Sequence, residues 1–412
     1  MELTSSVAGI DVHKSMLAVV VGRADLPERQ WKRCKFGATT QALGRLAEWL
    51  QQQGVREVVM ESTAQYWKPV WIALEEGFRL HLAQALSTKG PRGRKTDYRD
   101  ATRLVKRLLS DDLTLSYVPD AEQRRWRLLT RTRYQIRRDR VRLRNQMEGL
   151  LEEGQIKLSS VVSDLLGVSG RRMLEALAQG ETDPAKLAAL GDERLRVTTE
   201  DLQEALGGQL HPTHQALLRL ALDRLDLMER HLEKVDGEIA QALRAHQEVV
   251  ERLCQVPGIS VQSAQQILAE VGPQAATFAS APQLASWVGV CPGRQESAGE
   301  STSNRSAKGN RPLRRVLNQV AWAAVKSKGS FFQLLFRRWV PRLGVKKAIW
   351  AVAHRVLRLI WKVLHQGVRY EERGPLPRSP QALRRRRARL LRELCALGYD
   401  VTLSPRPATI LA

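Results

Sequence analysis

The sequence is short of acidic residues, of cysteine and of long apolar stretches. It has 43 Asp and Glu against 66 Lys and Arg, a formal net charge of +23 at pH 7. Such an excess of positive charge is typical of nucleic-acid binders, and binding to a membrane surface is the competing explanation. No run of about 18 apolar residues occurs, which argues against a membrane-spanning helix. A strand-like pattern begins almost at the N-terminus, so we expect no signal peptide.

The four cysteines are too scattered to suggest a metal or disulfide framework. They stand at Cys34, Cys254, Cys291 and Cys395, with neither zinc-site spacing nor paired spacing. The basic, glycine-containing segment 90–95 also lacks the glycine spacing of a P-loop. We therefore expect a soluble, reduced, intracellular protein without a structural zinc site or a nucleotide cradle of that type.

Four acids stand where strands end or a helix begins. Asp11 closes the apolar run 7–10, Glu61 closes the run 58–60, and Asp97 and Asp100 open a helix. Carboxylates in such positions can converge on one point. There they would repel one another unless a hard cation such as Mg²⁺ or Mn²⁺ lay between them. In a chain this basic, the pattern predicts two-metal chemistry on a phosphodiester.

Each acid also has a purely structural explanation. An Asp after a strand is a common turn residue, Asp97 can cap the helix, and Asp100 is favourable in its first turn. Taken singly, each acid fits either explanation. The order of the surrounding elements favours the catalytic one.

The N-terminal pattern predicts a mixed α/β fold. We expect strands at 6–12, 17–22 and 31–36, a helix at 40–53 capped by Thr39 or Thr40, a strand at 57–61, a helix at 65–76, a strand at 79–84 and a helix from Thr96. This order is that of a ribonuclease-H-like (RuvC-like) domain, in which acids of the first strand, the fourth strand and a late helix meet. The segment before the last helix predicts phosphate contacts by Arg92, Arg94 and Lys95.

Beyond about residue 120 the sequence is dominated by helices. Two heptad patterns predict a coiled coil, formed within one chain or between chains. Their inner positions are Trp126, Leu129, Arg133, Ile136, Arg140, Leu143, Met147 and Leu150, and then Leu218, Ala221, Leu225, Met228, Leu232, Val235, Ile239 and Ala242. Between 124 and 144 there are ten arginines and one acid, Asp139. A solvated face usually mixes signs, so we expect phosphate contacts by Arg131, Arg137, Arg138 and Arg142.

A Pro-Gly turn at 257–258 separates two helical stretches. The pattern predicts a helix-hairpin-helix whose turn amides, with Gly258, face a DNA phosphate, and an ordinary helical hairpin is the alternative. Further on, we expect a loop at 300–312 and helices at 313–326 and 345–366.

Ser297 lies in a glycine-flanked segment followed by basic residues. It is a candidate nucleophile, with Ser301, Ser303 and Ser306 as rivals, and a turn role is the alternative. The basic residues that we expect to favour a phosphate nearby are Arg305, Lys308, Arg311, Arg314 and Arg315.

These motifs together resemble the transposases of the insertion-sequence 110 family, which are related to the Piv-type DNA invertases. The resemblance rests on Gly9-Ile10-Asp11-Val12-His13-Lys14, Met60-Glu61-Ser62-Thr63 and 94–101, and on 256–259, 289–293, Glu296-Ser297-Ala298-Gly299 and Gly309-Asn310. It implies that Asp11, Glu61, Asp97 and Asp100 bind metal and that Ser297 is the catalytic serine. The segments near 150–215 and beyond Arg373 depart from the family pattern.

The resemblance implies a DNA recombinase of the bacterial cytoplasm, associated with the nucleoid. It would form a covalent serine–DNA intermediate on double-stranded donor and target DNA, guided by a noncoding RNA from the element itself. The acid domain of one subunit would meet the serine domain of another in a homodimer or tetramer, with no membrane partner. At 412 residues the chain is too long for one core. We predict a ribonuclease-H-like domain at 1–118, a helical coiled-coil spacer at 119–248, an all-α C-terminal domain with the helix-hairpin-helix at 249–372 and a basic tail at 373–412.

Two rival functions use the same residues differently. A ribonuclease-H-like junction nuclease needs the acids for hydrolysis but no serine, and a non-enzymatic nucleic-acid-binding protein needs neither. A DEDD exonuclease is disfavoured, because His13 stands where that group has a Glu in its Asp-x-Glu motif.

Overall fold

The computed structural model describes residues 5–62, 64–84, 96–293, 295–297, 300–303, 306–372 and 380–402. The chain divides into two compact units, 1–120 and 121–412. The first unit is built on a sheet and the second is almost entirely helical. In the described residues, no helix is both long enough and apolar enough to cross a membrane.

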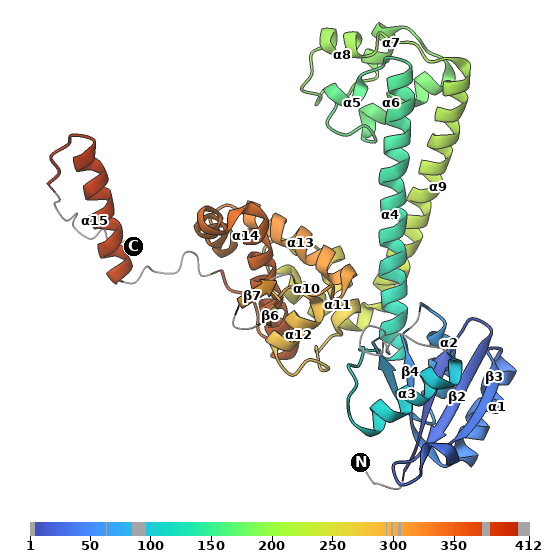
Figure 1. Cartoon of the computed structure of the whole chain (residues 1–412). Helices are drawn as coiled ribbons and strands as arrows, with labels where there is room; N and C mark the ends of the chain where they lie inside the picture. Colours follow the sequence, from blue (N-terminus) through green and yellow to red (C-terminus); the bar gives the residue numbers. More distant parts are fainter. Residues whose placement is uncertain are drawn as a thin grey trace. The chain divides into compact units, whose positions relative to one another are not determined.

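The first unit contains one mixed five-stranded sheet, drawn in blue in Figure 1. Its strands are β1 (Ser6–Val12), β2 (Met16–Gly22), β3 (Lys32–Gly37), β4 (Val55–Glu61) and β5 (Arg79–Ala83). Their spatial order is β3-β2-β1-β4-β5. β1, β2 and β3 are antiparallel neighbours, whereas β4 runs parallel to both β1 and β5. The predicted mixed sheet is therefore confirmed.

Helices cover both faces of this sheet. α1 (Thr40–Gln52) and α2 (Trp67–Leu74) share a core with one face, which includes Ile10 and Met60. α3 (Asp97–Leu109) packs on the other face against Val59 and its neighbours. α3 approaches β1 very closely, because a Cβ on Gly9 would lie 2.4 Å from the carbonyl oxygen of Ala101. This contact fixes the first turn of α3 relative to β1.

Two long antiparallel helices open the second unit. α4 (Ala121–Glu153) and α9 (Pro212–Ala242) lie side by side in Figure 1. Ion pairs join Arg133 to Asp236 at 3.0 Å and Arg140 to Glu229 at 3.4 Å. The two predicted heptad stretches thus pair within one chain. On α4 the buried positions include Trp126, Thr130, Arg133, Leu143, Met147 and Leu151, whereas the predicted Leu129 and Leu150 are only partly buried.

Four short helices, labelled around the far end of this pair in Figure 1, connect α4 to α9. They are α5 (Leu158–Val161), α6 (Val168–Gln179), α7 (Pro184–Ala189) and α8 (Thr199–Ala205). Their apolar side chains share one core with the ends of α4 and α9, for example Met147, Met173 and Leu218. This segment, to which the sequence assigned no chemistry, therefore has its own hydrophobic core.

The rest of the second unit is a helical assembly with one small hairpin. It contains α10 (Gln247–Cys254), α11 (Val261–Val271), α12 (Ala281–Val288), β6 (Gln295–Ser297), β7 (Glu300–Ser303), α13 (Arg311–Lys326), α14 (Phe331–His365) and α15 (Pro380–Ala396). The prediction of a loop at 300–312 was partly wrong, because residues 300–303 form β7, which pairs with β6. The helix expected at 345–366 is confirmed, because α14 is interrupted at Gly344, where φ is +71°, and its second part runs from there to His365. α15 was not predicted; it lies in the expected basic tail.

Candidate active site and nucleic-acid interface

Asp11 and Glu61 lie on neighbouring parallel strands at the same end of the sheet. Ile10 of β1 pairs with Met60 of β4, so the residues that follow them stand side by side. Ile10 and Met60 belong to the core under α1 and α2. Because successive side chains of a strand point to opposite faces, Asp11 and Glu61 are directed to the α3 face. The strand register thus brings these two predicted acids to one edge.

The first turn of α3 supplies the other two acids. Thr96 is the N-cap residue, in an extended conformation, and Asp97 is the first helical residue, so the expectation that Asp97 might cap the helix was wrong. Asp97 and Asp100 both lie in the first helical turn. Carboxylates are electrostatically favourable there, because the helix macrodipole is positive at its N-terminus.

Among the described residues, Asp11, His13 and Asp97 form a group that could hold a metal ion. One donor atom of each lies within 4.8 Å of the others. The Nε2 atom of His13 is 3.2 Å from Oδ2 of Asp11 and 3.5 Å from Oδ1 of Asp97. Glu61 and Asp100 are not members of this group. Asp100 instead accepts a hydrogen bond from Arg103 at 2.9 Å. The structure therefore brings two of the four predicted acids into direct proximity and places the other two at adjoining positions.

The electrostatics of this group suit a hard cation. Burial raises the pKa of Asp11, the nearby His13 opposes that rise, and the charges of Asp100 and Asp97 add to it. The ionised carboxylates therefore repel one another, and a divalent cation between them would remove this repulsion. Carboxylate oxygens are the ligands that Mg²⁺ and Mn²⁺ prefer. Asp11 and Asp97 are the residues placed to hold such an ion, with Glu61 and Asp100 beside them.

Sequence reasoning missed two further residues at this edge. His13 was given no role at the metal site, although it stands two residues after Asp11 in the turn that leads into β2. Lys35 on β3 places Nζ 3.9 Å from Oδ2 of Asp97 and 5.6 Å from the centre of the Tyr98 ring. Only the strand order could have revealed Lys35, because β3 reaches this edge through pairing with β2.

The arginines expected on α4 have different surroundings. Arg131 donates to both carboxylate oxygens of the buried Glu270, at 2.8 and 2.9 Å, although its own side chain is 46% exposed. Arg142 pairs with Asp139 at 2.9 Å, and both side chains are exposed. Arg137 bonds to the side chain of Gln262, and Arg138 is exposed beside it. Arg137 and Arg138 are thus the best placed of the four to meet a phosphate.

The Pro-Gly turn joins α10 to α11, as the helix-hairpin-helix pattern predicts. Gly258 has φ +86°, and a Cβ there would lie 2.5 Å from backbone atoms of Val320 and Ala324 on α13. The packing of the turn against α13 therefore accounts for this glycine without any phosphate. Ser260 caps α11, and its side chain accepts from the amide of Ser263.

Ser297 is the last residue of β6 and pairs with Glu300 of β7. After this hairpin, Arg314 donates to the carbonyl of Ala307 at 2.8 Å and to that of Gly289, and lies 4.9 Å from the Trp350 ring. Arg314 therefore holds the segment between the hairpin and α13, and its contact with a phosphate stays a prediction.

The remaining predicted basic residues fall into two groups. Lys308 and Arg311 are exposed at the start of α13. Four predicted contacts lie outside the described residues, namely Arg92, Arg94, Lys95 and Arg305.

Comparison with known proteins identifies both parts of the chain. A DEDD transposase model of the IS110 family matches residues 8–155, and the model described as transposase of the IS116/IS110/IS902 family matches residues 250–335. A Pseudomonas aeruginosa protein described as a family 20 transposase is 27% identical over 327 residues, which is 76% of this chain and 85% of that protein. A Sinorhizobium fredii protein described as transposase y4rJ is 27% identical over 333 residues, 74% of this chain and 75% of that protein.

The two matched segments contain all four predicted acids and the predicted serine, in the expected order. Together they cover more than half of the sequence. The chain belongs to the IS110 family of insertion-sequence transposases.

Proposed function

We propose that this transposase cuts and rejoins DNA strands by transesterification, with a divalent-metal site at Asp11, Glu61, Asp97 and Asp100 and with Ser297 as the nucleophile. The observation that supports the metal site most strongly is the meeting of β1, β4 and the first turn of α3 at one edge of the sheet. The strand order β3-β2-β1-β4-β5 supports the assignment of this unit as ribonuclease-H-like.

The proposed reaction has two balanced steps. In the first, Oγ of Ser297 attacks the scissile phosphorus, the bond from phosphorus to the 3′ oxygen breaks, and the serine proton ends on that oxygen. In the second, a 3′-hydroxyl of another strand attacks the same phosphorus, the bond from phosphorus to Oγ of Ser297 breaks, and the proton of the hydroxyl ends on Oγ. A divalent cation, when bound, supplies neutralisation of charge at the phosphate. Asp11 and Asp97 would hold it, while the Lys35 ammonium limits the net negative charge of the edge.

The proposed partners follow from the resemblance and from the charge. Double-stranded donor and target DNA, with a noncoding guide RNA, would meet a chain whose net charge is +23. Arg137, Arg138, Lys308 and Arg311 are exposed positions suited to phosphate contacts. The resemblance also supports an oligomer in which one subunit's acids serve another subunit's serine.

Strand cleavage by single variants tests the metal site. Asp11→Asn, Glu61→Gln, Asp97→Asn and Asp100→Asn should each lower cleavage of DNA carrying the element's ends by more than about 100-fold, because even outer-shell partners of metal sites typically account for 10–100-fold. Binding of the same DNA should stay near that of the wild type. Asp25→Asn is the matched control, because Asp25 is exposed and pairs only with Arg23 among the described residues. Equal cleavage by wild type and Asp11→Asn would contradict the metal site.

A further inference from the structure

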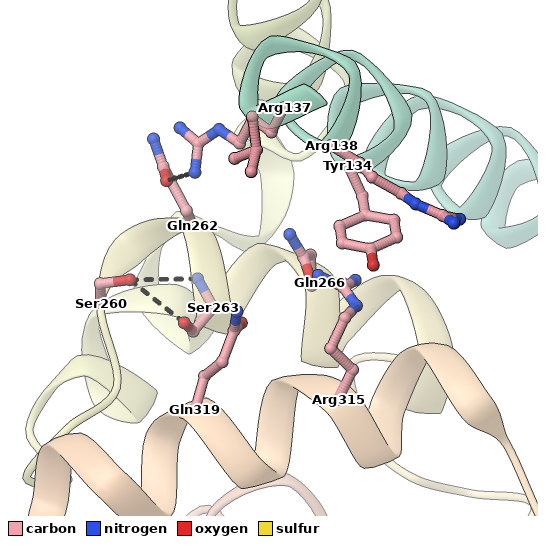
Figure 2. Close-up of a pocket in the computed structure, with 10 residues that line it drawn as sticks. Tyr134, Arg137, Arg138, Ser260, Gln262, Ser263, Gln266, Arg315 and Gln319 are labelled. Carbon is pink, nitrogen blue, oxygen red and sulfur yellow. Dashed lines mark hydrogen bonds between the residues drawn. The ribbon is translucent and has the colours of Figure 1, made fainter. Parts of the chain in front are cut away.

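A cavity of about 450 Å³ lies between α4, α11 and α13, within the second unit. Figure 2 shows that side chains from all three helices point into it. None of the ten described residues that line the cavity is acidic, whereas three of them are arginines. A volume of this size lies in the range of pockets that take ligands the size of small molecules, about 300–1,000 Å³.

The three arginines give the cavity a positive wall. Arg137 and Arg138 extend from α4 at its mouth, where both are exposed. Arg315 of α13 lies deeper, with its guanidinium carbon 3.4 Å from the centre of the Tyr134 ring. Burial lowers the pKa of Arg315, and the charge of the nearby Glu270 opposes that change. Glu270 is itself hydrogen-bonded by Arg131 and Asn310. These partners largely offset the effect of its negative charge on the cavity.

The opposite part of the wall is neutral and rich in hydrogen-bonding groups. Gln262, Gln266 and Gln319 contribute side-chain amides, and the N-terminal turn of α11 adds two serine hydroxyls. The oxygen of Gln266 accepts from Arg315 at 3.2 Å, which leaves its amino group to donate. Gln319 has no side-chain hydrogen-bond partner in the described part of the chain. Amides offer both donors and acceptors, which is the chemistry that reads the edge of a nucleic-acid base.

We propose that this cavity binds one unpaired nucleotide of a nucleic-acid strand, with its phosphate at Arg137 and Arg138 and its base edge against the amides of Gln266 and Gln319. A phosphate alone would use the arginines and leave the amide wall without a function. A base within a duplex presents only its groove edges, whereas an unpaired base can enter the cavity and offer its whole edge to the amides. The inference rests on the proposed function in one respect, namely that strand exchange produces unpaired strands.

Binding measurements on the full-length protein test the proposal. The probes are a fluorescent DNA strand of about 16 nucleotides, the upper end of single-strand site sizes, its RNA counterpart and the duplex of the same sequence. Gln319→Ala should weaken binding of a single strand about fivefold, as expected for one lost hydrogen bond, and leave the salt dependence unchanged. Arg138→Ala should reduce the slope of log affinity against log salt by about 0.7, the value for one phosphate contact on a single strand.

Two controls make the result specific. Gln135→Ala removes an exposed amide of α4 that does not line the cavity, and it should change neither quantity. Affinity for the duplex should be unaffected by Gln319→Ala, and inorganic phosphate should compete only weakly. Loss of affinity for the DNA strand alone, or for the RNA strand alone, would identify which strand supplies the nucleotide.

The outcomes separate this proposal from the function on which it rests. Unchanged single-strand affinity in Gln319→Ala, or an equal loss of duplex affinity, would overturn the nucleotide pocket while leaving strand cleavage intact. If the wild type bound neither the single strands nor the duplex, this result would contradict the proposed function itself.

Discussion

Asp11 is the residue on which the acid site depends most. Its pKa is raised, chiefly by burial, so in the absence of metal the proton binds more tightly to the folded than to the unfolded protein. Its contribution to stability is therefore greatest below the unfolded pKa near 3.8 and falls as the pH rises toward the folded value. At neutral pH an ionised Asp11 without a cation destabilises the first unit.

Thermal unfolding with and without divalent metal tests this. Without metal at pH 7, Asp11→Asn should raise the melting temperature by roughly 1–4 °C, since it removes the ionised group. Mg²⁺ or Mn²⁺ should raise the melting temperature of the wild type but have little effect on the variant. A variant that melts below the wild type without metal, or that gains equally from metal, would contradict the account of Asp11.

Glu270 shows how a buried acid serves structure instead. Its side chain is 2% exposed and is held by Arg131 and Asn310. Glu270→Ala should therefore lower the free energy of unfolding of the second unit by about 3 kcal/mol or more, because Arg127, whose side chain is only 12% exposed, loses its ion-pair partner. Asp139→Ala breaks only an exposed pair with Arg142 and should cost less than about 1 kcal/mol. Denaturant titration measures both, and similar values for the two would refute the distinction.

At the scale of elements, local signals predicted most of the first unit. Apolar runs located β1, β2 and β4, and the Thr39 side chain caps α1 by accepting from the amide of Ala42 at 3.4 Å. The position of Asp11 and Glu61 at one edge of the sheet could also be predicted from the sequence, because both acids follow apolar runs. The position of Lys35 at this edge could not be predicted, since it depends on long-range strand pairing that no local pattern encodes.

The errors in the second unit have physical causes. The inner face of α4 follows contacts with α9 and α11, so Thr130 and Leu151 are buried where a strict heptad would bury Leu129 and Leu150. The hairpin of β6 and β7 was missed because its polar residues show no alternation. The ion pair of Arg131 was not predicted, because its partner, Glu270, lies 139 residues away in sequence.

The helix-hairpin-helix offers a test with a matched control. Gly258→Ala should lower the free energy of unfolding by about 2 kcal/mol or more, since the added Cβ meets backbone atoms of α13 at 2.5 Å and φ is positive. Gly237→Ala on α9, where nothing lies within 4 Å, should instead stabilise by about 0.5–1 kcal/mol. A Gly258→Ala variant of unchanged stability but reduced DNA affinity would favour phosphate binding by the turn.

For the whole molecule, the proposed acids and serine belong to different compact units. Asp11 is in unit 1–120 and Ser297 in unit 121–412. If subunits share active sites, a mixture of Asp11→Asn and Ser297→Ala proteins should regain part of the wild-type strand exchange, although neither variant is active alone. Recombination assays on the mixture measure this, and a mixture as inactive as its components would argue for sites built from one chain.

The central claim is that a metal site and Ser297 together form a covalent link to DNA. The most direct measurement is a denaturing gel of the wild type incubated with labelled DNA from the element's ends, the guide RNA and Mg²⁺. We predict a protein–DNA adduct that disappears in Ser297→Ala, in Asp11→Asn and after removal of the metal, and that persists in Ser301→Ala, Ser303→Ala and Ser306→Ala. An adduct that survives in Ser297→Ala would place the nucleophile elsewhere, and cleavage by the wild type without any adduct would show a hydrolytic nuclease.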